Sequence, residues 1–285
     1  MGKRAAIVGA GRVGRTLGRR LRALGWKIGA VVTRSPRTAR AAVRAIGAGR
    51  PQARLDERVL ECDLLLIATP DRAIAGVATA LAKCAGRGWR GKVVLHTSGA
   101  LGREALAPLA RRGAATGSLH PMQTFSGRGT PRLDGVCFAV EGVPRARQLA
   151  ARIARGLGGV PVALNARRKP AYHAAGALAA GHVMTVVEAA TRILVALDFP
   201  RRRAAAALLP LVRQTLDNFE RLGPRAAWTG PLSRGDFATV AKHAAALRRF
   251  PREYAEAYAA LTRLGARLLA QRPAPVLRRL RRTLK

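Results

Sequence analysis

The chain has 285 residues, enough for two modest domains, and its 49% hydrophobic and 24% charged residues are typical of a soluble globular protein. Lys and Arg (52) outnumber Asp and Glu (15), for a net charge of +37. Arginine is scattered through nearly every segment, without a basic arm, which argues against a dedicated nucleic-acid-binding protein. The three cysteines show neither a metal-ligand pattern nor a disulfide framework, as expected in a reducing cytoplasm.

Short apolar runs and helical segments alternate through the first half of the chain. The runs are continuously apolar, which indicates strands buried on both faces of a parallel sheet. With helices between them, the expected fold is α/β, with a doubly wound, mostly parallel sheet. The predicted strands lie in AAIVGAG, KIGAVVT, CDLLLIATP, KVVLHTSG, AATGSLHP, GVCFAVEG and GGVPVALN, and the predicted helices include residues 39–46, 72–84 and 101–110.

The first strand leads directly into GAGRVG, residues 9–14. Gly9, Gly11 and Gly14 have the G-x-G-x-x-G spacing, in the strand-to-helix context that a dinucleotide site requires. Gly9 permits a tight turn, Gly11 admits a pyrophosphate to the backbone, and Gly14 allows close helix packing. The loop, with Arg12 and Val13, is therefore predicted to bind a nicotinamide dinucleotide at a helix N-terminus. A glycine-rich turn without a ligand is the alternative.

The second strand ends in Thr33, Arg34 and Ser35, with no carboxylate nearby. Sites that prefer NAD usually carry an acid here for the ribose hydroxyls. Arg34 can instead donate a fork of hydrogen bonds to a 2′-phosphate, with the two hydroxyls as further donors. We therefore expect NADP(H) to be preferred over NAD(H), unless Arg34 is one more surface arginine.

Later strands end in polar residues that should meet in one crevice, because ligands bind beyond the carboxyl ends of parallel strands. Thr69 and Pro70 are expected to shape a turn against the nicotinamide half of the cofactor. Asp71 is expected to be a helix N-cap rather than a catalytic acid. Thr97 and Ser98 either cap the next helix or hold a substrate carboxylate. Gly99 and His120 lie at the same strand ends.

After GGVPVALN the pattern becomes almost entirely helical, with prolines near the starts of the segments. This change places a domain boundary near residue 165, between residues 1–165 and an all-helical domain over residues 166–285. The longest apolar stretch, residues 174–197, contains His182, Glu188 and Arg192, which favours a buried helix over a membrane span. The predicted helices cover residues 170–197, 201–222, 236–248 and 252–270, followed by a short basic tail helix.

Lys169 is unusual, because only seven lysines occur in a chain that otherwise uses arginine for positive charge. It shares one predicted helix face with Tyr172, His173 and Gly176. Reduction of a ketone by hydride needs a proton donor or a cation at the developing alkoxide, and a partly desolvated lysine can be either. Tyr172 and His173 are predicted to orient the substrate or relay protons. The alternative is that Lys169 is an exposed residue at a helix start.

A second polar group lies in the sequence GPLSRGD of the helical half. Asp236 is expected to cap the next helix. Arg234 either binds an anionic group of the substrate or is a solvated charge. We include both residues in the predicted substrate site.

The motifs GAGRVG, LHTSG, LHPMQTF, KPAYHAAG and TGPLSRGD-ATV-KH together resemble a bacterial family of Rossmann-like predicted oxidoreductases, whose C-terminal helical domain was long classed as of unknown function. More distantly, the layout is similar to that of 3-hydroxyacid dehydrogenases, ketopantoate reductases and deazaflavin-dependent NADP reductases. The resemblance implies that Lys169 is a general acid, that HTSG binds substrate, and that residues 166–285 form the substrate and dimerisation domain. Gly181 departs from the pattern, which leads us to expect an asparagine there.

The sequence therefore predicts a cytoplasmic, homodimeric NADP(H)-dependent oxidoreductase that reduces a small anionic carbonyl compound, a 2-oxo acid of the ketopantoate type. No metal, membrane or specific nucleic acid is expected. The alternative is a non-catalytic NADP-binding sensor or partner protein of the same fold. The predicted catalytic residues are Lys169, His120, His173 and Ser98, and the predicted substrate-binding residues are Thr97, Ser98, Gly99, Tyr172, Arg234 and Asp236.

Overall fold

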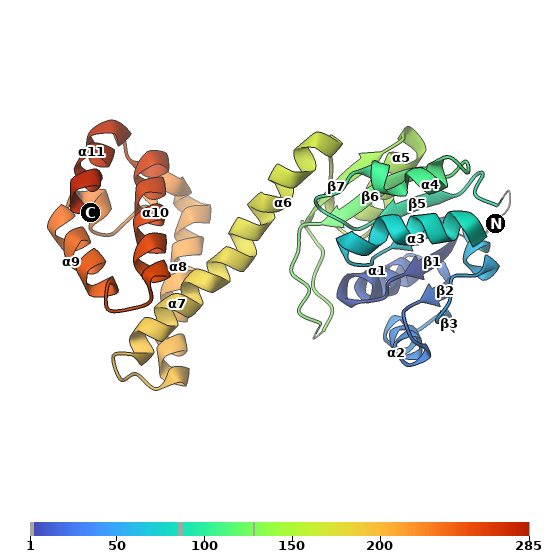
Figure 1. Cartoon of the computed structure of the whole chain (residues 1–285), viewed down its shortest axis with the longest axis horizontal. Helices are drawn as coiled ribbons and strands as arrows, with labels where there is room; N and C mark the ends of the chain where they lie inside the picture. The colour runs from blue at the N-terminus through green and yellow to red at the C-terminus, as the bar shows by residue number, and fades with distance from the viewer. Residues whose placement is uncertain (1–2, 85–87, 128, 285) are drawn as a thin grey trace. The chain divides into compact units, whose positions relative to one another are not determined.

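Two compact units make up the chain. The computed structural model describes residues 3–84, 88–127 and 129–284, and it divides into Met1–Ala180, the sheet unit, and Gly181–Lys285, the helical unit (Figure 1). The division falls later in the chain than the boundary expected near residue 165. The reason is that the helix beginning at Lys169 is tied to the sheet unit through its first side chain, which bonds to Ser98 and Ser118.

The sheet unit is built on one eight-stranded sheet in the order β3-β2-β1-β4-β5-β6-β7-β8. Neighbouring strands pair in parallel except for β6 and β7, which confirms the predicted mostly parallel α/β fold. The strand order reverses between β1 and β4, the position at which such sheets bind ligands. The strands are β1 (Arg4–Val8), β2 (Lys27–Val32), β3 (Arg50–Gln52), β4 (Leu64–Ile67), β5 (Val93–His96), β6 (Ala115–Pro121), β7 (Cys137–Gly142) and β8 (Val160–Ala163).

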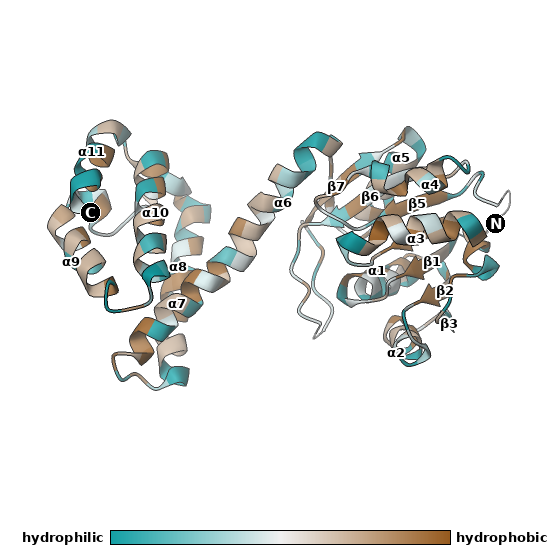
Figure 2. Ribbon diagram, in the orientation of Figure 1, coloured by the Kyte–Doolittle hydropathy of each residue, from teal (hydrophilic) through white to brown (hydrophobic). Residues whose placement is uncertain are grey.

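Helices cover both faces of this sheet, and the strands between them are strongly hydrophobic (Figure 2). On one face, α1 (Arg12–Ala23), α2 (Pro36–Ile46) and α5 (Pro144–Gly156) pack through apolar residues such as Leu17, Ile46 and Ile153. On the other face lie α3 (Asp71–Cys84) and α4 (Ala107–Ala110). The layers account for the continuous apolar strands of the sequence, since both sides of each strand are buried.

Several short elements of the sheet unit differ from the expected ones. The helix predicted over residues 101–110 is a 3-10 turn, η2 (Arg103–Leu106), followed by the single turn α4, which has a proline in its first turn. The edge strand β3 and a 3-10 turn, η1 (Glu57–Leu60), were not predicted. A further 3-10 turn, η3 (Ala166–Arg168), leads into α6 (Lys169–Ala177).

The helical unit consists of helices and short turns over its described residues, as predicted. A small core forms where Val240, Ala266 and Leu280 meet. The longest helix bends at Gly223, which has φ 76° and precedes Pro224, close to the expected helix end at residue 222. The elements are α7 (Val183–Val195), α8 (Arg201–Ala226), η5 (Leu232–Arg234), α9 (Phe237–Leu247), α10 (Arg252–Leu269) and α11 (Pro273–Thr283).

The apolar stretch over residues 174–197 is not a buried helix in this chain, so that expectation was wrong. It forms the end of α6, a π-helical turn (Leu178–His182) and α7, and Leu178 and Met184 are 61% and 69% exposed. The helical stretch Ala166–Val195 is long and apolar enough to cross a membrane by length and composition alone. Two of its charged residues, Glu188 and Arg192, form an ion pair, and Glu188 also pairs with Arg201.

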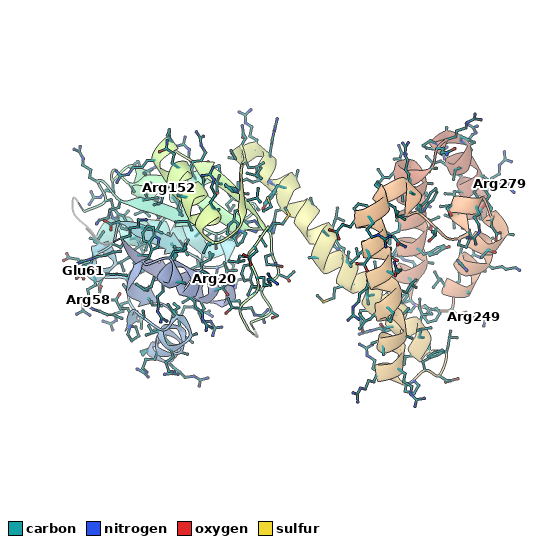
Figure 3. The ribbon with its side chains drawn as sticks, turned by 180° about the vertical axis from the view of Figure 1, so that it is seen from behind. Arg20, Arg58, Glu61, Arg152, Arg249 and Arg279 are labelled. Atoms are coloured by element: carbon teal, nitrogen blue, oxygen red, sulfur yellow. The ribbon has the colours of Figure 1, made fainter. Side chains whose placement is uncertain are left out.

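The arginines are distributed over both units. Figure 3 shows Arg20, Arg58 and Arg152 on the sheet unit, and Arg249 and Arg279 on the helical unit. This spread agrees with the even distribution of arginine along the sequence.

Candidate active site

The loop between β1 and α1 has the geometry that its glycine spacing predicts. Gly9 has φ +86°, and a Cβ there would lie 2.6 Å from the backbone nitrogen of Thr69. A Cβ on Gly14 would overlap the carbonyl oxygen of Gly9, whereas a Cβ on Gly11 would meet nothing within 4 Å. The fold therefore requires the first and third glycines, while Gly11 leaves the start of α1 open to a ligand.

The first turn of α1 is suited to a phosphate group. Gly11 is its N-cap residue, so no side chain occupies the free backbone N–H groups, and the turn contains no acidic residue. Arg12 is exposed at the start of the helix, and its guanidinium lies 3.5 Å from the carbonyl oxygen of Phe125. Val13 packs against the core of the sheet unit. The predicted phosphate loop is therefore available as a binding surface.

Arg34 lies exposed in the turn after β2. The two neighbouring hydroxyls hold the start of α2: Ser35 Oγ accepts from the Thr38 backbone N–H at 3.3 Å, and Thr33 Oγ1 lies 2.6 Å from Thr38 Oγ1. Among the described residues, the Arg34 guanidinium has no hydrogen bond or ion pair. It is therefore free to meet an anion, while the hydroxyls predicted to assist it are already used in the helix cap.

Residues at the end of β4 connect the dinucleotide loop to the loop after β5. Thr69 packs against Gly9, and its Oγ1 is buried without a hydrogen-bond partner among the described residues, while Pro70 is exposed. Asp71 is the first residue inside α3 rather than its N-cap, and its Oδ2 accepts a 2.7 Å hydrogen bond from Ser98 Oγ. Asp71 therefore positions the loop after β5.

Lys169 is completely buried, so it is not an exposed residue at a helix start. Its Nζ donates to the carbonyl oxygen of Ser98 at 2.9 Å and to Ser118 Oγ at 2.7 Å. Ser98 belongs to the loop after β5 and Ser118 to β6. One ammonium group thus joins the first turn of α6 to two neighbouring strand regions of the sheet.

The surroundings of Lys169 make its ammonium group easier to deprotonate than that of an exposed lysine. Burial lowers the pKa of Lys169 to about 8, and the carboxylates of Glu141, Glu104 and Asp71 partly oppose this shift. Burial in turn raises the pKa of Glu141, whose Oε2 accepts from the Arg103 backbone N–H at 2.8 Å. The amine can therefore exchange its proton much closer to neutral pH than an exposed lysine.

Side chains hold the loop after β5 in one conformation. Ser98 Oγ accepts from the backbone N–H groups of Ala100 at 3.1 Å and Leu101 at 3.0 Å. Of the two roles expected for this serine, capping or binding a substrate carboxylate, these bonds correspond to capping. His96 is fully buried; its Nδ1 accepts from the Ser98 N–H, and its Nε2 donates to the Gly102 carbonyl. Burial, followed by the nearby Lys169 charge, lowers the pKa of His96 to about 4, so this histidine is a neutral structural group.

Three ring side chains meet beside this loop, from β6 and α6. His120 Nδ1 lies 3.1 Å from Tyr172 Oη, and the His120 ring meets the Tyr172 and His173 rings edge-on, with centroids 5.5 Å apart. Gly99 provides the space, because a Cβ there would lie 2.7 Å from His120 Nε2 and 2.5 Å from His173 Nδ1. Burial, then His173 and Lys169, lower the pKa of His120 to about 4.

The sheet unit thus brings together Lys169, Ser98, Gly99, His120, Tyr172 and His173, with Thr97 half-buried at the end of β5. Ser118 and Glu141 were not predicted as members of this network, and His96 was expected there only as part of the HTSG segment. Ser118 stands two residues before His120 in one strand, so the period of two placed both on one face. Glu141 is the one carboxylate in the apolar run CFAVEG, and a carboxylate in such a run indicates a buried charge that needs a partner.

Arg234 and Asp236 belong to the helical unit. Arg234 is exposed at the end of η5. Asp236 is the N-cap of α9, as expected, and its carboxylate accepts from the Thr239 N–H at 3.0 Å and from Thr239 Oγ1 at 2.7 Å. Gly181, where an asparagine was expected, lies in the π-helical turn with open space around it.

Two family descriptions match consecutive parts of the chain. Residues 3–121 match a Rossmann-like domain, and residues 136–264 match a domain of unknown function, DUF2520. The chain is a Rossmann-like domain joined to a DUF2520 domain. This confirms the family that the sequence motifs resembled. The DUF2520 match begins just before β7, so Glu141, Lys169, Tyr172 and His173 all fall within it. No curated protein matches the chain.

Solved structures share this DUF2520 chain's fold over nearly its whole length. A candidate NADP oxidoreductase from Bacteroides fragilis is 21% identical over 92% of this chain and 97% of its own, with a TM-score of 0.75. A Thermotoga maritima protein is 22% identical over 97% and 99%, with a TM-score of 0.71. The imine reductase of Streptomyces aurantiacus is 18% identical over 98% and 99%, with a TM-score of 0.70. At these identities the likeness concerns the fold.

Proposed function

We propose that this DUF2520 protein is a nicotinamide-dependent reductase. The shape of the loop between β1 and α1 supports this, because Gly11 is open where a pyrophosphate would approach and Gly9 and Gly14 have no room for side chains. Gly9–Gly14 would hold the pyrophosphate, with Thr69 and Pro70 against the nicotinamide half. When bound, the cofactor supplies the hydride. Two of the proteins of like fold are described as a candidate NADP oxidoreductase and an imine reductase, which agrees with this assignment.

NADP(H) is the proposed cofactor, in preference to NAD(H). Arg34 supports this choice, since its guanidinium is exposed at the end of β2 and has no partner among the described residues. A guanidinium can donate two parallel hydrogen bonds to a 2′-phosphate. A carboxylate, which would favour the free ribose hydroxyls, does not occur in the turn Thr33–Ser35.

The proposed substrate is a small anionic carbonyl compound, with a 2-oxo acid of the ketopantoate type as the specific candidate. The observation that carries the proposal is the buried ammonium of Lys169, which is bonded to the loop after β5 and to Ser118 of β6. In a site of low polarity, such a cation stabilises negative charge that develops on a reacting oxygen. Ser98, Gly99 and His120 would surround the substrate, with His173 on the solvent side. Arg234 and Asp236 stay predictions for the helical unit.

Turnover of reduced cofactor with a panel of pyruvate, ketopantoate and 1-pyrroline tests this function. We expect oxidation of NADPH with at least one 2-oxo acid, and slower oxidation of NADH. Turnover of 1-pyrroline alone would replace the carbonyl assignment by reduction of a C=N bond. Arg34→Ala should lower NADPH affinity about tenfold or more, since hydrogen bonds to charged groups contribute about 1.5–3 kcal/mol, while NADH affinity is retained. Arg44→Ala is the control, because it removes the same positive charge at the far end of α2.

A non-catalytic NADP-binding sensor is the second candidate. It is favoured by Ser98, whose hydroxyl already makes three hydrogen bonds within the protein, and by Gly181, which has no side chain to contact a substrate. Tight NADPH binding, without turnover of any compound in the panel, would select this candidate over the reductase.

We further propose that the protein is a cytoplasmic homodimer, with the second copy covering α7. This is supported by Val183, Met184 and Val186, which are 39%, 69% and 48% exposed on one helix of the single chain. Light scattering after gel filtration should show a dimer, and Met184→Glu should shift it towards monomer, whereas Met184→Leu should not. A monomeric native protein at micromolar concentration would contradict the proposal.

A further inference from the structure

The residues of the site differ in how far they are buried. Lys169 is 0% exposed, His120 and Tyr172 are half-buried, and His173 is exposed. A group that transfers a proton to a substrate has to touch it. The layer between the core and the solvent, rather than the core itself, is therefore where the proton donor of the proposed reaction should lie.

Lys169 is committed to the protein. Two of its three N–H groups already donate to Ser98 and Ser118. Ser98 is itself fixed by Asp71 and by the backbone of its own loop. Turning the ammonium towards a substrate oxygen would leave the Ser98 carbonyl and the Ser118 hydroxyl unpaired in the core, and each such loss costs about 1–3 kcal/mol. The geometry suits a group that holds two strands together and provides a fixed positive charge.

Tyr172 lies one turn after Lys169 on α6 and carries a hydroxyl in the half-buried layer. Its Oη is 3.1 Å from His120 Nδ1. The other side of the His120 ring faces Gly99, where a side chain would collide with Nε2. The imidazole is thus held between the tyrosine hydroxyl and the loop after β5, close to the exposed ring of His173.

We propose that Tyr172 gives the proton to the atom that gains charge during reduction, that His120 restores this proton, and that Lys169 is a positioning residue. The assignment rests on the proposed reductase function and names the proton donor within it. Tyr172 is the catalytic residue in this scheme, because its hydroxyl touches the reacting oxygen. His120 and Lys169 act through it and through the loop after β5.

Reduction of a carbonyl substrate adds one electron pair with a hydrogen to carbon and one proton to oxygen. The electron pair comes from the nicotinamide cofactor, and the substrate oxygen takes the proton of Tyr172 Oη as that O–H bond breaks. The phenolate then takes the proton of His120 Nδ1, while His120 Nε2 takes one from water on the side of His173. One water proton is consumed for each carbonyl reduced, and that water leaves as hydroxide. His120 stays neutral, but its proton now lies on Nε2, so exchange with solvent has to return it to Nδ1 before the next turnover.

The ionisation of both groups agrees with these roles. Burial and the neighbouring Cys137 thiol raise the pKa of Tyr172 to about 12, so the hydroxyl keeps its proton at neutral pH. His120, with its pKa lowered to about 4, is neutral there and can accept a proton on one nitrogen while releasing one from the other.

Single-turnover oxidation of bound NADPH, with ketopantoate and 1-pyrroline as probes, tests the assignment. Tyr172→Phe removes only the hydroxyl and should lower the single-turnover rate by about 100-fold or more, with NADPH affinity retained. The solvent deuterium isotope effect on that step should be lost. Tyr254→Phe, which removes a tyrosine hydroxyl from α10, is the matched control and should leave the rate and the isotope effect unchanged.

The two positioning residues should behave differently from Tyr172. His120→Gln keeps a hydrogen-bonding group beside Tyr172 but cannot pass a proton, so it should lower steady-state kcat while the single-turnover rate is retained. Lys169→Met should raise KM and slow the reaction but keep the solvent isotope effect. The ionisation of Tyr172 can also be measured without activity. The phenolate absorbance of Tyr172→Phe is subtracted from that of the native protein during a pH titration. The difference should show no ionisation of Tyr172 at pH values where an ordinary tyrosine titrates.

Each result separates this assignment from the proposed function. If the native chain oxidises NADPH with a probe and Tyr172→Phe does so at the same rate, or keeps the isotope effect, the proton does not come from Tyr172 and the reductase function stands. Loss of the isotope effect in Lys169→Met would assign the proton to the lysine. If the native chain turns over no probe, the function and the assignment are both overturned.

Discussion

The two units of this chain bury their apolar residues to very different extents. In the sheet unit, strands such as β1 and β4 are buried along most of their length between two layers of helices. Among the described residues of the helical unit, the buried apolar side chains are Ala204, Val240, Ala266, Ala270 and Leu280. In the same unit Met184, Leu211 and Leu268 are 69%, 64% and 62% exposed.

This difference shows which unit can complete a core from its own residues. A sheet covered on both faces buries every side chain of its central strands, so a continuous apolar strand finds partners within the unit. A helix with apolar residues on more than one face needs a neighbour on each of those faces. We therefore expect changes in the sheet unit to act on folding and on the site directly, and changes in the helical unit to act more weakly on the single chain.

The largest effect is expected from Gly9→Ala in the sheet unit. Gly9 has φ +86°, and the added methyl group would lie 2.6 Å from the Thr69 backbone, so strain and overpacking should lower the free energy of unfolding by about 2–5 kcal/mol. Urea denaturation measures this. Gly29→Ala, in β2, is the control, because its nearest contact would be an ordinary 3.7 Å. Equal stability of the two variants would show that the turn is looser than described.

Lys169 should give the sheet unit an unusual dependence of stability on pH. Its pKa falls from 10.5 in the unfolded chain to about 8 in the fold, so between these values the unfolded chain holds the proton that the folded chain has released. Stability therefore rises with pH from about 8 to 10.5, by at most roughly 3 kcal/mol. The difference between the native protein and Lys169→Met in urea unfolding isolates this contribution. No difference in slope across this window would mean that the amine is not desolvated.

Gly11→Ala should separate binding from folding within the same loop. The added methyl group points into open space, so stability should fall by less than about 1 kcal/mol, the cost of a poorer N-cap. NADPH affinity should fall by about tenfold or more, because the methyl group stands where the pyrophosphate approaches the backbone. Thermal shift with and without NADPH reads both quantities in one experiment. Unchanged affinity would place the dinucleotide elsewhere.

Much of the sheet unit could be predicted from local patterns in the sequence. Continuous apolar runs marked the central strands, and the spacing of Gly9, Gly11 and Gly14 fixed the turn between β1 and α1. The edge strand β3 escaped prediction because it has three residues, one of them Pro51, and no apolar run. The site was less predictable. Lys169 was found from its rarity, but its partner Ser118 depends on strand pairing, which no local pattern reports.

The exposure of α7 shows a second limit of prediction from sequence. An apolar helix looks the same in sequence whether its own chain, a second copy or a lipid covers it. The charged residues Glu188 and Arg192 led to the expectation of burial within the chain, whereas they pair with each other at an exposed surface. The composition of the helix indicates that its apolar residues need a partner, but it does not identify that partner.

The smallest effect is expected in the helical unit, from Asp236→Ala. The carboxylate caps α9 through Thr239, and losing the cap should lower the free energy of unfolding only slightly, as urea denaturation would measure. These hydrogen bonds lower the pKa of Asp236, so the contribution is present near neutral pH and disappears as acid protonates the carboxylate. Asp236→Ser should restore the cap, because a serine hydroxyl also accepts from the helix N-terminus. If Asp236→Ser regains stability but turns over substrate more slowly than the native chain, Asp236 also contacts the substrate, and the helical unit then contributes more than packing.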